Sequence, residues 1–147
     1  MFDRDAQRSR ELFESGLYCA ESVLLAIAEN KGIHSEWIPK IATGFCSGLA
    51  RTCGTCGAVS GAVMGINLVA GRNTPEEPLD GDYAAVCQFL EGFENRFGSI
   101  NCLQLTGCDL GTPEGQASFQ AKHVIERCND YVEEATRLAL SIIENIS

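Results

Sequence analysis

The segment at residues 56–69 has the sequence CGAVSGAVMGINLV, and it decides how the rest of the chain must fold. Its glycines Gly57, Gly61 and Gly65 recur every four residues, so they lie along one stripe of a helix. Because a glycine inside a helix costs about 1 kcal/mol relative to alanine, three on one stripe need a compensating contact. We expect a close approach by another backbone, or by a cofactor that Gly57 and Gly61 would contact. The segment is therefore predicted to be a helix at the centre of the fold.

Helical periodicity also dominates the sequence on both sides of this segment. Apolar spacing and stop signals predict helices at residues 6–14, 20–30, 35–41, 82–97 and 116–143, and a short cysteine-bearing segment is expected at residues 101–106. Residues 43–55 are rich in Gly, Ser and Thr, which is typical of a loop or a broken helix. No alternating run of β-branched residues is long enough for a sheet. The sequence predicts an all-α fold, a single-domain bundle of about six helices over residues 1–147 with the Gly-rich helix at its centre.

Length and charge limit the classes of partner. The 147 residues suffice for one domain, and 11 Lys and Arg against 20 Asp and Glu give a net charge of −9. This charge disfavours binding to nucleic acid and to anionic membrane surfaces. The longest apolar run, residues 58–70, is shorter than the roughly 20 residues that span a bilayer, and residues 1–8 do not resemble a secretory leader. We therefore expect a soluble cytoplasmic protein that binds neither nucleic acid nor membrane.

Cysteine is the residue type that points most directly to chemistry. The chain has eight cysteines, at Cys19, Cys46, Cys53, Cys56, Cys87, Cys102, Cys108 and Cys128. Their density is below that of a disulfide scaffold, and cytosolic thiols stay reduced. Metal binding or redox chemistry is therefore the better interpretation of the set. Cys87 lies among apolar residues of a predicted helix, and we expect it to be an ordinary buried residue.

Cys53 and Cys56 form a Cys-x-x-Cys motif where a Gly-rich turn enters the helix at residues 56–69. Free backbone N–H groups and the positive end of the helix dipole favour a thiolate at such a place. The motif can serve as a metal clamp or as a redox dithiol. Because the β-α-β pattern of a thioredoxin-like fold is absent from the sequence, the pattern favours metal.

Five parts of the sequence, in order, resemble one known family. CGAVSG at residues 56–61 matches the C-G-A-x-x-G core of the redox-active protein family named for its C…GCAxxG…C…C pattern. GLYCAESVL at 16–24 is similar to the family's early cysteine helix, and TGFCSGLAR at 43–51 is similar to its glycine-rich approach to the core. FGSINCLQLT at 97–106 resembles the segment of the third cysteine, and Cys128 matches the last one. The resemblance extends over nearly the whole chain.

The resemblance implies an all-helical fold and redox or metal-centre chemistry. It places the family's four cysteines, here called the four motif cysteines, at Cys19, Cys56, Cys102 and Cys128. A related domain accompanies the haem-binding part of split-Soret cytochromes, where it is associated with an iron–sulfur centre. Four thiolates suit an iron–sulfur cluster or zinc, and no Cys-x-x-Cys-His motif supports covalent haem. Cys19 and Cys56 are expected at the beginnings of helices and Cys102 in a short turn, with Cys128 in the middle of a helix.

Three hypotheses follow. The first is an electron-transfer protein that binds an iron–sulfur cluster through the four motif cysteines and serves a redox partner protein. The second is a metal-free thiol–disulfide oxidoreductase in which Cys56 attacks and Cys53, or another nearby cysteine, resolves the mixed disulfide. The third is a structural zinc module that binds a partner, which the wide ligand spacing slightly disfavours. A small redox subunit could also form a homodimer around its cofactor.

Three cysteines and both histidines stay outside this ligand set. Cys46, Cys53 and Cys108 lie near the motif segments and could be extra ligands, resolving thiols or packing residues. We expect neither His34 nor His123 to bind metal. His123 is predicted to lie on the same helix as Cys128 but on another face.

Overall fold

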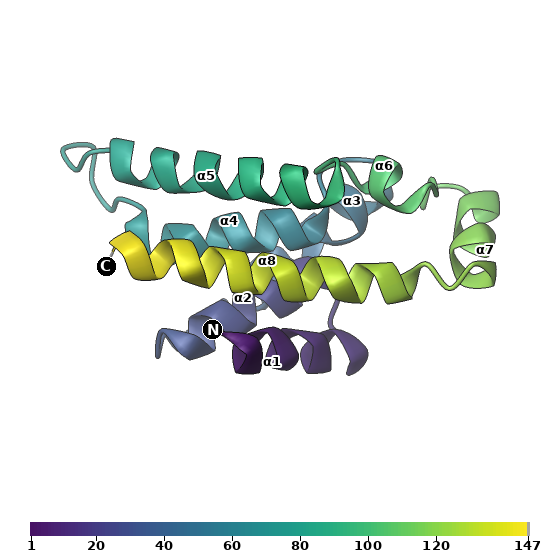
Figure 1. The fold of residues 1–147 in the computed structure, drawn as a ribbon, viewed down its shortest axis with the longest axis horizontal. Coiled ribbons are helices and arrows are strands. Elements are labelled where there is room, and N and C mark those ends of the chain that lie inside the picture. The colour runs from purple at the N-terminus through teal and green to yellow at the C-terminus, as the bar shows by residue number, and fades with distance from the viewer. Residues whose placement is uncertain (147) are drawn as a thin grey trace.

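A computed structural model describes residues 1–146 as an all-helical chain (Figure 1). In these residues the α-helices are α1 (Asp3–Glu14), α2 (Cys19–Asn30), α3 (Cys46–Arg51), α4 (Gly57–Ala70), α5 (Asp80–Phe97), α6 (Cys102–Thr106), α7 (Pro113–Ala121) and α8 (Ile125–Ile146), with a 3-10 helix, η1 (Lys40–Phe45), before α3. The described residues contain no strand, only an isolated bridge between Thr55 and Asn101. The all-α prediction is confirmed, although the structure has eight α-helices and not about six.

The structure has more helices than predicted partly because one predicted helix is interrupted. The segment at 116–143, predicted as one helix, belongs to α7 and α8, and the chain turns between them at His123 with a φ of 52°. Helix α7 begins earlier than predicted, with Pro113 in its first turn and the Thr112 hydroxyl accepting a hydrogen bond from the Gly115 N–H at 2.9 Å. The predicted helix at 35–41 is replaced by turns that lead into η1.

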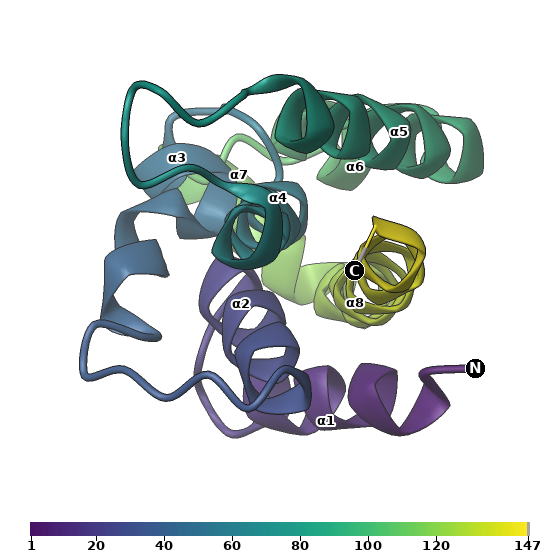
Figure 2. The same ribbon diagram turned by 90° about the vertical axis from the view of Figure 1, so that its left-hand side faces the viewer.

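The glycine stripe of α4 lies against α2. Helix α4 packs on α2, α5 and α8, and Figure 2 shows it end-on between α2 and α5. A Cβ atom on Gly61 would lie 2.6 Å from the Ala20 carbonyl oxygen, and one on Gly65 would lie 2.6 Å from Cδ1 of Ile27. Of the two contacts that the sequence suggested for this stripe, Gly61 thus makes the close approach to a backbone. The close contact is what offsets the low helix propensity of glycine.

The buried residues of α5 recur every four positions, and Cys87 is not among them. Ala85, Phe89 and Phe93 are buried and face α4 and α8. Cys87 falls on the opposite side and is exposed, so the prediction that it is a buried residue was wrong.

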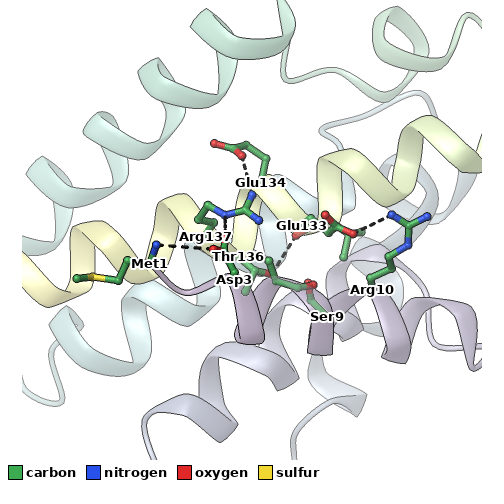
Figure 3. A network of polar contacts seen from close by, with 10 residues as sticks. Met1, Asp3, Ser9, Arg10, Glu133, Glu134, Thr136 and Arg137 are labelled. Carbon is green, nitrogen blue, oxygen red and sulfur yellow. Dashed lines mark hydrogen bonds and ion pairs between the residues drawn. The ribbon is translucent and has the colours of Figure 1, made fainter.

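Polar pairs attach α1 to α8 (Figure 3). Arg10 donates to the Glu133 carboxylate at 2.9 Å, and Arg137 bridges Asp3 and Glu134 at 3.1 Å each. Partly exposed pairs of this kind contribute up to about 1 kcal/mol each. They fix the position of α1 on the long helix.

The helices α2, α4 and α8 all begin at one end of the molecule, where α3, α6 and α7 also gather (Figure 1). None of the helices within residues 1–146 combines the length and the apolar character needed to cross a bilayer.

Candidate functional site

The end of the bundle where α2, α4 and α8 begin contains a pocket of about 430 Å³. All four motif cysteines line it, together with the aromatic side chains of Tyr18 and Tyr131. The fold therefore brings together cysteines that lie on four different elements, α2, the start of α4, α6 and α8. We call this space the cysteine pocket.

Cys19 reaches the cysteine pocket because Gly57 leaves room for it. Cys19 is the first residue of α2, and the Glu21 carboxylate caps the helix by accepting the Tyr18 N–H at 3.0 Å. The Cys19 sulfur lies directly against Gly57, where a Cβ atom would overlap with it and come within 3.1 Å of the Ala20 nitrogen. Gly57 also lines the pocket, whereas Gly61, the other predicted cofactor contact, does not, because it faces the backbone of α2.

Cys56 and Cys102 are held side by side by two backbone hydrogen bonds. The Cys56 N–H donates to the Ile100 carbonyl at 2.7 Å, and the Cys102 N–H donates to the Gly54 carbonyl at 2.9 Å. Asn101 reinforces this pairing, since its side-chain amide donates to the Cys53 carbonyl at 2.8 Å. A short antiparallel contact, not expected from the sequence, thus joins the second and third motif cysteines.

Cys56 is the N-cap of α4, as the Cys-x-x-Cys motif predicted. Burial raises the pKa of its thiol to about 12, although the N–H groups of Ala58 and Val59 donate to the sulfur and act in the opposite direction. The predicted effect of the helix terminus is therefore present but smaller than the cost of removing a thiolate from water. Without a metal, Cys56 is a neutral thiol near pH 7.

Cys128 lies in the first turn of α8 and not in the middle of a helix, because α8 begins at Ile125. Burial, with a smaller contribution from Cys102, raises the pKa of the Cys128 thiol to about 12. The neighbouring Arg127 fixes this turn by donating to the Thr106 carbonyl at 3.2 Å. The fourth motif cysteine is thus also at a helix beginning.

A left-handed turn forms the wall beside Cys102. Residues 47–51 have φ angles between 55° and 67°, although only Gly48 among them is glycine. Such a conformation costs about 1–2 kcal/mol per non-glycine residue. The turn brings Gly48 so close to Cys102 that a Cβ atom would lie 2.6 Å from the Cβ of Cys102. The loop or broken helix predicted at 43–55 is in fact η1 followed by this turn in α3.

The remaining cysteines near the motif segments have different surroundings. Cys53 does not line the pocket; its thiol hydrogen-bonds the Asp109 carboxylate, which raises its pKa. The Cys108 thiol is buried and donates to the Thr106 carbonyl at 3.5 Å. Cys46 is buried beside α2, where a hydrogen bond to Cys19 and burial raise the pKa of its thiol.

The arrangement of the motif cysteines indicates what kind of metal group the pocket could bind. Among the described residues, no group of three or more His, Cys, Asp or Glu side chains converges as it would around one metal ion. A zinc ion held at about 2.3 Å by four sulfurs would keep them about 3.8 Å apart. The motif cysteines instead surround a pocket with room for several atoms. His123 also lines this pocket, since it belongs to the turn before α8 and not to the helix itself.

Residues 17–142, which contain all four motif cysteines, match the model of the family described as "Putative redox-active protein (C_GCAxxG_C_C)". The chain belongs to this family. The resemblance drawn from its motifs is thereby confirmed. Comparison with curated proteins and with solved structures found no match. In this C_GCAxxG_C_C protein, the pattern that names the family supplies the cysteines of a single pocket.

Proposed function

We propose that this protein transfers electrons in the cytoplasm through an iron–sulfur cluster bound in the cysteine pocket by the four motif cysteines. One observation carries the proposal: cysteines from four elements line a single pocket of about 430 Å³. When bound, such a cluster accepts and releases one electron at a time. The chain would supply the ligands, the surrounding charge distribution and the contact with a redox partner protein.

The donor set fits this group. Iron–sulfur clusters are held by cysteine thiolates, and each motif cysteine is free in the structure. Burial keeps Cys56 and Cys128 protonated, with each pKa raised to about 12. Binding of metal would therefore release protons from these thiols, and affinity would fall as the pH is lowered.

The start of each of three helices favours negative charge in the pocket. Cys19 opens α2, Cys56 caps α4 and Cys128 lies in the first turn of α8. The positive end of a helix dipole stabilises anionic groups. The N–H groups of Ala58 and Val59, which donate to the Cys56 sulfur, would reduce the electron density on this ligand. Hydrogen bonds of this type raise the reduction potential of a cluster.

The other two hypotheses have less support. A zinc site requires thiols around one point, whereas the described residues surround a larger space. A Cys53–Cys56 dithiol requires the two thiols to face each other, whereas Cys53 is directed to Asp109 and does not line the pocket.

Iron content in a set of cysteine variants tests the ligand assignment. We expect Cys56→Ser, Cys102→Ser and Cys128→Ser to lose most of the iron of the wild-type protein, measured after purification without oxygen. Cys87→Ser is the matched control, since Cys87 is exposed on α5 away from the pocket. Full iron retention in the three pocket variants would overturn the assignment.

A further inference from the structure

Cys46 is held in a defined position by several contacts, although it is not one of the proposed cluster ligands. It is 4% exposed and lies where η1 passes into α3. Its thiol donates to a Glu21 carboxylate oxygen at 3.6 Å. The backbone N–H groups of Ala20 and Glu21 also donate to the Cys46 sulfur, which places this sulfur on the first turn of α2.

The residue next to Cys46 on that turn is Cys19. The Cys46 thiol hydrogen-bonds the Cys19 sulfur. Both side chains pack in one apolar cluster with Ala20 and Leu24. Gly57 contacts the Cys19 sulfur and lies close to the carbonyl of Phe45, the residue that precedes Cys46. The hydrogen bond joins the two sulfurs, and the packing around them keeps Cys19 and Cys46 together at the start of α2.

Glu21 fixes this arrangement. One of its carboxylate oxygens accepts the Tyr18 N–H at 3.0 Å and the Cys46 thiol, and the other accepts the Thr43 hydroxyl at 2.8 Å. The carboxylate thereby joins the beginning of α2 to η1 and to Cys46. The thiol of Cys46 is therefore buried and held beside Cys19.

We propose that Cys19 and Cys46 form a second redox centre, a dithiol that exchanges with low-molecular-weight disulfides when Cys19 carries no metal. The different solvent exposure of the two thiols assigns their roles. Cys19 is partly exposed and lines the cysteine pocket, so an incoming disulfide reaches it first. Cys46 is buried behind it and resolves the mixed disulfide. This activity goes beyond the proposed electron transfer, and it does not require the cluster.

The chemistry is a two-step exchange. The Cys19 thiolate attacks one sulfur of the disulfide RSSR, so that a Cys19–SR bond forms, the S–S bond of RSSR breaks and RS⁻ leaves. The Cys46 sulfur then attacks the Cys19 sulfur, forms the Cys19–Cys46 bond and expels the second RS⁻. The two thiol protons of the protein end on the two leaving thiolates. Two protein thiols are oxidised, and RSSR is reduced to two RSH.

Peptide mapping of the full chain after treatment with oxidised glutathione tests the proposal. The protein is treated both as purified and after removal of bound metal with a chelator, and circular dichroism records whether each sample keeps its helices. We expect Cys19–Cys46 to be the dominant disulfide in the metal-free sample, reversed by reduced glutathione. A dominant Cys53–Cys56 linkage, scrambled pairing or no disulfide at all would overturn the proposal.

Two variants separate the resolving step from general reactivity. Cys46→Ser is expected to stop at a stable glutathione adduct on Cys19, whereas Cys87→Ser should form the Cys19–Cys46 disulfide as the wild-type protein does. Absence of the adduct in Cys46→Ser would contradict the assigned roles. So would formation of an intramolecular disulfide in this variant to the same extent as in the wild-type protein. Iron content of the untreated samples tests the cluster separately, so failure of one proposal leaves the other standing.

Discussion

Gly57 shows at the scale of a single residue how the cysteine pocket depends on a missing side chain. A Cβ atom at Gly57 would overlap with the Cys19 sulfur and lie 3.0 Å from the Phe45 carbonyl oxygen. We expect Gly57→Ala to lower the free energy of unfolding by about 1–3 kcal/mol, because backbone must move to admit it. Urea denaturation measures this change.

Gly81→Ala provides the matched control for that substitution. Gly81 lies in the first turn of α5, and a Cβ atom there would meet nothing within 4 Å. This variant should gain up to about 1 kcal/mol of stability, because alanine restricts the unfolded chain. Equal effects of the two substitutions would show that Gly57 has no special contact.

The raised pKa values of two thiols predict a pH dependence at the same scale. Burial raises the pKa of Cys56 and of Cys128 to about 12 in the folded protein, compared with about 8.5 in an unfolded chain. Because the folded state retains these protons longer, their contribution to stability is complete below pH 8.5. It is lost between about pH 8.5 and 12, with a slope of about 1.4 kcal/mol per pH unit for each thiol.

Denaturation of the metal-free protein at pH 8 and pH 10 measures this loss. Cys56→Ala should show a smaller fall in stability between the two pH values than the wild-type protein, whereas Cys87→Ala, at an exposed position, should show the same fall. An identical fall in Cys56→Ala and the wild type would contradict burial as the cause.

At the scale of the element, the left-handed turn in α3 is the least expected feature. Ala50 is exposed there with a φ of 55°. We expect Ala50→Gly to raise the free energy of unfolding by about 1 kcal/mol, since glycine adopts this backbone conformation without strain. Thermal or urea denaturation can detect the gain.

The opposite change is expected in an ordinary helix. Ala84 is an exposed residue of the right-handed α5, so Ala84→Gly should lose about 1 kcal/mol. A loss of stability in both variants would contradict the strained turn.

The sequence predicts elements well where apolar spacing and stop signals agree. The predicted helices at 20–30 and 82–97 differ from α2 and α5 by at most two residues at either end, and Gly98 ends α5 with a φ of 89°. The break at His123 is not predicted because positive φ is uncommon in non-glycine residues, so a single residue within an apolar helical pattern does not indicate a turn. The same reason hides the left-handed turn, in which four of five residues carry side chains.

The candidate site was predictable only in part. The motifs identify the four cysteines that line one pocket, because the residue type of a possible ligand is known directly from the sequence. The Cys53 thiol hydrogen-bonds Asp109, and the Cys46 thiol hydrogen-bonds Cys19. Both contacts join residues that are distant in sequence, so they depend on the tertiary structure and could not be predicted. Sequence spacing favours the pair Cys53–Cys56, whereas the fold favours a pair 27 positions apart in the chain.

At the scale of the whole molecule, the pocket joins elements that are distant in sequence. The motif cysteines lie on α2, at the start of α4, on α6 and on α8, so a bound group would connect all four elements. Because binding to the folded state alone adds to its stability, removal of metal should lower the melting temperature by about 10 °C. Calorimetry before and after chelation measures this shift, and an unchanged melting temperature in protein that had contained metal would contradict a ligand set spread over four elements.

The most direct test of the central claim is a visible spectrum of the wild-type protein, purified without oxygen, with iron, sulfide and zinc determined on the same sample. We expect equimolar iron and acid-labile sulfide, with charge-transfer absorption that bleaches on reduction. A colourless protein without iron and sulfide, with or without zinc, would contradict the assignment of the cysteine pocket to an iron–sulfur cluster.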